Sequence, residues 1–344
     1  MSDRTPPSRS FNTVKHSNRA RRSKRLQKER SVLLSICIVV ILILLSLAVF
    51  LFCSIANSIK DNPGKDPQTP GDNTQQNPPS QTNIIYTQIT QSNASVHSGA
   101  LIVVSELLNH EYTYPRITLK SFADSDIHVK QNGTNPYQCT VLKSDEKMEI
   151  TAAYAADKML TDFYLTFNDS SLIFIDAYRT AEEQAGKVTA VGFSEHETGL
   201  VFTMQTYDST SKRTDLSKNL NYNWIYENCA KYGIICRYPD GKSAATGIDG
   251  YEHCFRYVGV PHATYITNNN LCLEEYVDLL KTNYAGDAHL SINAADGNTY
   301  EVYYIPAGAG ELTTVSVPQN YEYTVSGDNI GGFIVTVNLS KPVA

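Results

Sequence analysis

The run VLLSICIVVILILLSLAVFLFCSIA, residues 32–56, constrains this chain more than any other stretch because it contains no charged side chain. Roughly 20 consecutive apolar residues are enough for an α-helix to cross the hydrocarbon core of a bilayer. A cleaved signal peptide is the alternative, but its apolar region is about 7–15 residues long and is followed by a small-residue cleavage site. The length therefore favours an uncleaved, single-pass transmembrane anchor.

The formal net charge of −6 is distributed unevenly along the chain. Residues 1–31 contain ten Lys and Arg residues against Asp3 and Glu29, a balance of +8, so the remainder carries −14. The basic cluster RARRSKRLQKER directly precedes the apolar run, and the positive-inside rule places such a cluster in the cytoplasm. Nucleic-acid binding is the other use of a basic tail, but beside an anchor a topology signal and lipid contact explain it better. We therefore expect a cytoplasmic N-terminus, extracytoplasmic domains and no nucleic-acid partner.

Composition divides the rest of the chain into three parts. Residues 57–83 are rich in Pro, Gly, Asn and Gln and predict a flexible linker, since they cannot bury enough apolar surface to offset their ordering entropy. Residues 84–284 predict an α+β domain. Residues 285–344 contain short alternating runs separated by Gly, Asn and Asp, which predict a small all-β module.

Several elements of the α+β domain are predicted by their periodicity. Residues 148–167 have apolar side chains at helical spacing, and residues 99–108 and 171–180 are apolar runs typical of buried strands. Residues 221–239 predict a helix that ends at Gly233, followed by a strand. The run 171–180, SLIFIDAYRT, is expected to be a central strand whose end places Arg179 at a site.

Seven cysteines are present, and five of them lie beyond the anchor. An odd number in an oxidising compartment permits at most two disulfides and leaves one thiol. No CxxC pair occurs, so a structural zinc knuckle is not expected. The pairing stays open among Cys139, Cys229, Cys236, Cys254 and Cys272.

Three stretches together resemble the VanY-type zinc D-alanyl-D-alanine carboxypeptidases, bacterial enzymes that trim the terminal D-Ala of peptidoglycan stem peptides. They are DAYRTAEEQ at 176–184, SEHETGL at 194–200, and ENCAKYGIICRYPDGKSAATGIDGYEHCFRYVGVPHA at 227–263. The resemblance covers roughly residues 99–283. It implies a VanY-type D,D-peptidase core with an antiparallel sheet flanked by helices.

The resemblance also implies a metal site, but this sequence departs from the pattern. The first family zinc ligand matches His196, whereas the second, an Asp in the family, falls on Thr203. The third, a His in the family, falls on Cys254, and the general base, a Glu in the family, falls on Tyr251. A Tyr with an ordinary pKa of about 10 is a poor base at neutral pH. The resemblance therefore implies zinc, while the departures favour no bound cofactor.

An altered ligand set is the alternative. Glu195, Glu197, Glu252 and His253 lie beside Cys254 or His196 and are chemically able ligands. However, neighbours on a strand point to opposite faces, so His253 and Cys254 cannot both face one site. We expect the three glutamates to be solvated and His253 to be an ordinary surface or half-buried residue.

Cys254 has two further interpretations. It could form a disulfide with Cys229, Cys236 or Cys272, or remain a buried thiol, and we favour this group over metal ligation because extracytoplasmic cysteines are usually structural. A Cys254 nucleophile would need a low thiol pKa and a nearby base.

The substrate-binding positions of the family are better matched. Arg179 corresponds to the family Arg that binds the terminal carboxylate of the peptide, a role that suits the guanidinium fork. The alternative for Arg179 is an ion pair with Asp176, Glu182 or Glu183. Ser194, Gln184 and Tyr178 occupy matching positions.

Three functions remain open. The first, which we favour, is an anchored, non-catalytic family member that binds stem peptides or a cell-envelope protein. The second is an active zinc D,D-carboxypeptidase with an altered ligand set. The third is a docking scaffold that has no affinity for muropeptides.

Overall fold

The computed structural model describes residues 84–343, except 125, 128–138, 144, 208–209, 211 and 217–220. The predicted tail, anchor and linker, residues 1–83, lie outside the described residues. None of the helices within the described part of the chain is both long and apolar enough to cross a membrane.

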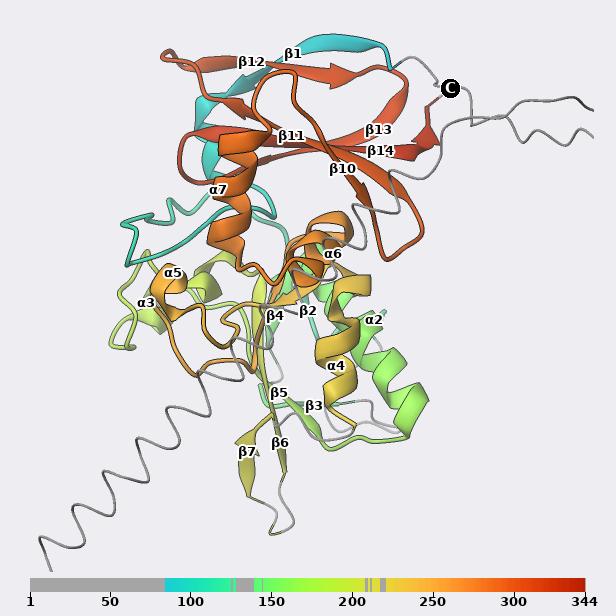
Figure 1. The fold of residues 1–344 in the computed structure, drawn as a ribbon. Helices are drawn as coiled ribbons and strands as arrows, with labels where there is room; N and C mark the ends of the chain where they lie inside the picture. The colour runs from blue at the N-terminus through green and yellow to red at the C-terminus, as the bar shows by residue number, and fades with distance from the viewer. Residues whose placement is uncertain are drawn as a thin grey trace, which may run out of the picture. The chain divides into compact units, whose positions relative to one another are not determined.

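A mixed sheet forms the centre of the lower part of the molecule in Figure 1. Its strand order is β3-β5-β6-β9-β8, and β7 pairs with the outer part of β6. Every neighbouring pair is antiparallel except β3 and β5. The strands are β3 (Thr140–Val141), β5 (Leu172–Asp176), β6 (Val201–Tyr207), β7 (Arg213–Asp215), β8 (Ile234–Cys236) and β9 (Cys254–Tyr257).

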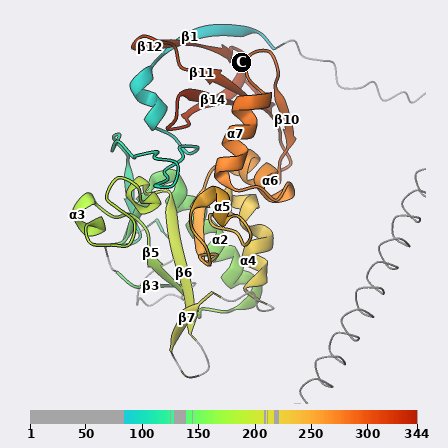
Figure 2. The same ribbon diagram turned by 60° about the vertical axis from the view of Figure 1, so that its left-hand side comes forward.

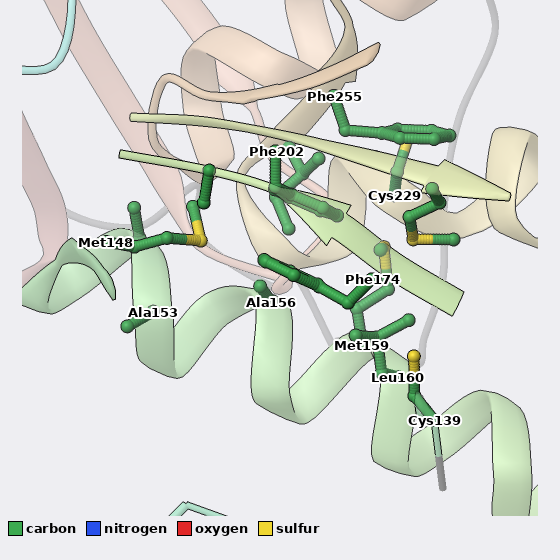
Figure 3. Packing of buried hydrophobic residues seen from close by; sticks show 14 of the residues in the cluster. Cys139, Met148, Ala153, Ala156, Met159, Leu160, Phe174, Phe202, Cys229 and Phe255 are labelled. Atoms are coloured by element: carbon green, nitrogen blue, oxygen red, sulfur yellow. The ribbon is translucent and has the colours of Figure 1, made fainter. Parts of the chain in front are cut away.

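The helix predicted over 148–167 is confirmed as α2 (Ile150–Phe167). The Glu149 carboxylate accepts from the first free backbone N–H groups, and Asn168 ends the helix in a left-handed conformation, φ 50°. Figure 3 shows the buried face of α2 beneath the sheet, where Phe174 and Phe202 stack with ring centroids 5.1 Å apart. This helix therefore covers one face of the sheet that carries the site.

The helix predicted to end at Gly233 is split into α4 (Asn223–Asn228) and a 3-10 turn, η3 (Cys229–Tyr232), and Gly233 ends it at φ 75°. The buried strand predicted at 99–108 is not formed. Residues 101–104 are buried, but the backbone N–H of Val103 donates to the Asp328 carbonyl instead of to a strand. The remaining helices are η1 (Asn93–His97), α3 (Ala181–Gln184), η2 (Glu195–Thr198), α5 (Ser243–Thr246), α6 (Val260–Asn268) and α7 (Leu273–Asn283).

The β-rich part at the top of Figures 1 and 2 contains the alternating runs predicted after residue 285. A four-stranded antiparallel sheet has the order β10-β11-β14-β13, and β12 pairs with β1. The first strand of the described chain, β1, therefore pairs with β12, a strand near its C-terminal end. The strands are β1 (Tyr86–Ser92), β10 (Leu290–Asn293), β11 (Thr299–Pro306), β12 (Leu312–Pro318), β13 (Tyr321–Gly327) and β14 (Gly332–Pro342), and a separate pair, β2 (Leu119–Ser121) with β4 (Lys147–Glu149), lies beside α2.

One apolar cluster joins the β-rich part to the rest. Leu280 of α7, Val302 of β11 and Ile334 of β14 are fully buried in it. His262 of α6 adds a polar link, because its ring nitrogens contact the Tyr276 hydroxyl at 2.8 Å and the Thr336 hydroxyl at 2.9 Å. The α+β class expected for this region is confirmed for the described residues.

Candidate functional site

Three strands bring residues far apart in sequence into one row. Asp176 at the end of β5 lies opposite Thr203 of β6, and Thr203 lies opposite Cys254 of β9. His196 joins this row because its ring Nδ1 lies 2.6 Å from the Ala177 carbonyl oxygen. The backbone N–H of Arg179 also donates to the His196 carbonyl at 3.1 Å. The turn η2 and the end of β5 are therefore held together by two hydrogen bonds.

Arg179 is paired within the site. Its Nε donates to Asp176 Oδ2 at 2.9 Å, its Nη2 donates to the same oxygen, and its Nη1 donates to Gln184 Oε1 at 2.9 Å. The Asp176 ion pair considered from the sequence is therefore present. A guanidinium has five N–H donors, so two remain, one on each terminal nitrogen. Arg179 can therefore keep its hydrogen bonds to Asp176 and Gln184 and still donate two more to a carboxylate.

Asp176 is held in its ionised form. Burial acts to raise the pKa of this carboxyl, but the hydrogen bond from Arg179 and the nearby charge of that guanidinium outweigh burial and leave the pKa below its usual value. The pair therefore places a fixed positive and a fixed negative charge at the end of β5.

His196 is neutral and has one unused ring nitrogen. A carbonyl oxygen can only accept, so the contact with Ala177 requires the proton on Nδ1. Burial, helped by the charge of Arg179, lowers the His196 pKa to about 4. Its Nε2 is buried and has no hydrogen-bond partner. The site therefore contains a buried acceptor that faces no donor.

Tyr251 and Cys254 lack the properties of a base or a nucleophile. Burial raises the Tyr251 pKa to about 12, so the phenol is protonated at neutral pH and cannot take a proton. Burial also raises the pKa of the Cys254 thiol well above its ordinary value. That shift is opposite to the one that an activated cysteine requires.

The residues at the site do not fit a catalytic zinc, which takes three protein ligands and an open position. His196 Nε2 and a deprotonated Cys254 could each ligate a metal. However, the Thr203 hydroxyl points to the Asp176 carbonyl at 3.4 Å, and the Asp176 carboxylate is bonded to Arg179. Within the described ranges, no three His, Cys, Asp or Glu side chains form a group that could hold a metal ion.

Two glutamates expected to be solvated are buried instead. Glu195 is 3% exposed and bonds Arg237 and Arg256, while Glu197 is 1% exposed and accepts from the Gly192 backbone N–H at 2.8 Å. Glu195 is paired with two guanidinium groups, and Glu197 accepts hydrogen bonds from two backbone N–H groups, which is why their burial is tolerated. His253 is half-buried, as expected, with its Nε2 3.8 Å from Asp215.

The ion network around Glu195 was missed in the sequence. Arg237 also binds Glu274 of α7 through both terminal nitrogens, with Nη1 at 3.0 Å and Nη2 at 2.5 Å. The sequence did contain an indication of this network, because Arg237 and Arg256 directly follow apolar residues in predicted strands. A charge at such a position needs a buried partner.

The other predicted residues lie nearby with structural contacts of their own. Ser194 is buried, and its backbone N–H donates to the Glu197 carboxylate at 3.2 Å. Tyr178 is half-buried, and its backbone N–H donates to the Lys147 carbonyl at 3.0 Å. Gln184 connects Arg179 to the Thr189 carbonyl, which its Nε2 reaches at 2.7 Å.

No disulfide joins the cysteines of the described region, so the pairing considered for Cys254 is not formed. Cys254 is a buried thiol. A buried thiol was the second of the two states, after a disulfide, that the sequence favoured over metal ligation. Cys139, Cys229 and Cys272 are buried as well, and the Cys236 sulfur lies 3.2 Å from the Glu252 carbonyl.

The part of the chain that carries this site is similar to known proteins. A family model described as VanY, D-alanyl-D-alanine carboxypeptidase, matches residues 145–260, which include every residue of the row. Residues 145–260 belong to the VanY-type D-alanyl-D-alanine carboxypeptidase family. The VanY-type assignment made from the three motifs is therefore confirmed.

Three relatives illustrate the extent of the similarity. A D-alanyl-D-alanine carboxypeptidase of Enterococcus faecium is 38% identical over 176 residues, 49% of this chain and 54% of the relative. The bifunctional D-Ala-D-Ala dipeptidase and carboxypeptidase VanXYC of Enterococcus gallinarum is 27% identical over 48% of this chain and 86% of its own. The crystal structure of the D,D-dipeptidase VanXYg, in complex with a D-Ala-D-Ala phosphinate analogue, superposes with a TM-score of 0.62 and 25% identity, covering 74% of this chain and 99% of that one. The chain spans about half the length of the first of these relatives.

Proposed function

We propose that this VanY-type protein is a membrane-anchored, extracytoplasmic module that binds the C-terminal end of peptidoglycan stem peptides without zinc-dependent hydrolysis. The observation that carries the proposal is Arg179, which is fixed by Asp176 and Gln184 and still has two N–H donors. A planar guanidinium with two donors on different nitrogens matches the two oxygens of a terminal carboxylate. D-Ala-D-Ala, on which the similar enzyme VanXYC acts, has such a carboxylate.

The loss of hydrolysis is proposed from the donor set and the base. The position of the second family ligand carries a neutral hydroxyl, Thr203, which is directed to a backbone carbonyl. The base position carries Tyr251, a phenol whose pKa is raised to about 12. The part of the chain that would act in binding is thus present, while the part that would activate water has been replaced.

Localisation belongs to the same proposal. The basic cluster before residues 32–56 orients the N-terminus to the cytoplasm, and residues 57–83 give the domain reach from the membrane. A stem-peptide ligand is found on the outer side of that membrane, so the predicted topology and the proposed ligand agree.

The experiment is a calorimetric titration of the full-length protein in detergent with an N-acylated tripeptide that ends in D-Ala-D-Ala. Saturable binding in the presence of a metal chelator is expected, with affinity reduced at least about tenfold in Arg179→Ala because a charge-assisted bidentate contact is lost. Arg179→Lys should be intermediate, since it keeps the charge and loses the fork. Arg213→Ala, which alters an exposed Arg on β7, is the matched control. Peptide affinity that Arg179→Ala leaves unchanged would contradict the proposal and favour a docking scaffold.

The zinc hydrolase is the second candidate because His196 Nε2 is a free, unprotonated ring nitrogen. Elemental analysis of the protein purified without chelator separates the two. Stoichiometric zinc that disappears in His196→Ala, together with release of D-alanine from the peptide, would favour the hydrolase. Absence of zinc after incubation with excess metal supports the binding module.

A further inference from the structure

The buried Nε2 of His196 has no hydrogen-bond partner among the residues that the structure describes. No described side chain, Cys254 included, donates a hydrogen bond to it. The Nδ1–H of the same ring is used by the Ala177 carbonyl, so the ring cannot turn over without losing that bond. A buried acceptor without a donor is unfavourable, and such groups in native proteins usually have a partner that the protein alone does not supply.

The chemistry of that partner follows from its surroundings. The Ala177 carbonyl holds the proton of the neutral ring on Nδ1, which leaves Nε2 as an acceptor, so its partner must be a donor. The N–H donors of Arg179 belong to the same site, because the Arg179 backbone N–H bonds the His196 carbonyl at 3.1 Å. Its guanidinium is also bonded to Asp176, the residue directly before the Ala177 carbonyl that holds the imidazole. A ligand of this site would therefore present an anion to Arg179 and a hydrogen-bond donor to His196.

We infer that His196 Nε2 accepts a hydrogen bond from the backbone amide N–H of the last residue of the bound peptide, whose carboxylate is bound by Arg179. This inference rests on the proposed function and adds the group that sets its specificity. A C-terminal residue has its carboxylate and its amide nitrogen on the same Cα atom, so one residue supplies both groups. In this chain a histidine that could hold a metal thus serves as a direct contact to the peptide.

The inference makes the site selective for an amide over an ester. In a depsipeptide the N–H is replaced by an oxygen, which offers a lone pair where His196 offers one too. A site that hydrogen-bonds an N–H rejects an analogue without it, because the buried polar atom is left unpaired. Free D-alanine has an ammonium group instead of an amide. Its binding tests whether an ammonium N–H, and not an amide N–H, donates to His196.

The experiment compares two ligands that differ in one atom, the N-acyl D-Ala-D-Ala peptide and its ester analogue, with D-alanine as a third ligand. All titrations use the full-length protein with chelator present. The wild-type protein is expected to bind the amide at least about tenfold more tightly than the ester. In His196→Phe, which keeps a ring and removes the acceptor, the two affinities should lie within about twofold. His253→Phe, an alteration of the neighbouring half-buried histidine, should keep the wild-type preference.

The outcomes separate the inference from the proposed function. Equal affinities of the wild-type protein for amide and ester would overturn the inference alone, and this comparison needs no variant to fold. Tighter binding of D-alanine than of the acylated peptide would also overturn it, because the donor would then be an ammonium. Failure of all three ligands to bind would overturn the proposed function and the inference with it. Equal affinities with chelator, together with a preference for the amide in a second set of titrations without chelator, would assign the contact to a metal and overturn it too.

Discussion

At the scale of the residue, Glu195 and His196 are adjacent in sequence and have opposite electrostatic surroundings. Glu195 lies between the guanidinium groups of Arg237 and Arg256. Burial acts to raise its pKa, but those two charges outweigh burial and lower it. His196 is held neutral by burial beside Arg179. One residue is thus an internal counter-ion and the next is a neutral acceptor, although both belong to η2.

The counter-ion role of Glu195 predicts a large loss of stability in Glu195→Gln. The substitution keeps the shape but leaves Arg237 and Arg256 with Glu274 as the remaining carboxylate of the network. Breaking a buried ion pair from one side costs about 3–5 kcal/mol. Urea unfolding should show this loss, while Glu311→Gln, at an exposed glutamate, should change the free energy of unfolding by less than about 0.5 kcal/mol. Equal effects of the two substitutions would mean that the network contributes no net stability.

At the scale of the element, the backbone turn and the packing at position 233 both require a residue without a Cβ. It ends η3 at φ 75°, and a Cβ there would lie 2.9 Å from backbone atoms of Gly259 and Val260. Its backbone carbonyl also accepts from Val258 at 2.8 Å. The glycine therefore allows both the turn into β8 and the close approach of the chain that follows β9.

Gly233→Ala is expected to destabilise the protein more than Gly241→Ala, which provides a matched comparison. Both glycines have φ near 75°, but nothing lies within 4 Å of a Cβ at Gly241. Gly241→Ala should cost about 1–2 kcal/mol from the left-handed backbone alone. Gly233→Ala should exceed that value by at least about 1 kcal/mol, because backbone atoms must shift. Similar midpoints of urea unfolding for the two variants would show that the chain relaxes around the added methyl group.

At the scale of the whole molecule, His262 ties α6 to α7 and to β14. Burial lowers its pKa from 6.5 to about 3, so the folded protein keeps this ring neutral. Between pH 6.5 and 3 the unfolded chain binds a proton that the folded chain does not. The stability contributed by this neutral ring is therefore complete above pH 6.5 and declines as the pH falls.

The measurement is urea unfolding of the wild-type protein and of His262→Phe at pH 7 and pH 5. The difference between the two free energies of unfolding should shrink by about 2 kcal/mol at the lower pH, because the variant has no ring to protonate. Tyr276→Phe removes one hydrogen bond and keeps the ring, so its difference from the wild type should not change with pH. A difference for His262→Phe that is the same at both pH values would mean that His262 titrates normally in the folded protein.

Sequence patterns predicted the elements well where a single period or a single residue decides the outcome. The helix α2, the end of η3 at Gly233 and the strands after residue 285 follow from local spacing, because helix and strand place apolar side chains at periods of about 3.6 and 2. The family motifs likewise placed Arg179, His196, Thr203 and Cys254 in one site. The strand expected at 99–108 was wrong because burial alone does not make a strand: its backbone bonds a loop of the β-rich part instead.

The sequence alone determined the VanY-type family, the α+β class and which residue types stand at the site. Only the tertiary structure decided what those residue types do. It paired Arg179 with Asp176, satisfied Glu195 inside the protein, and left His196 Nε2 without a donor. The physical reason is that the charge and the proton position of a side chain depend on the groups around it in space. Those groups come from β5, η2, β8, β9 and α7, which no local pattern brings together.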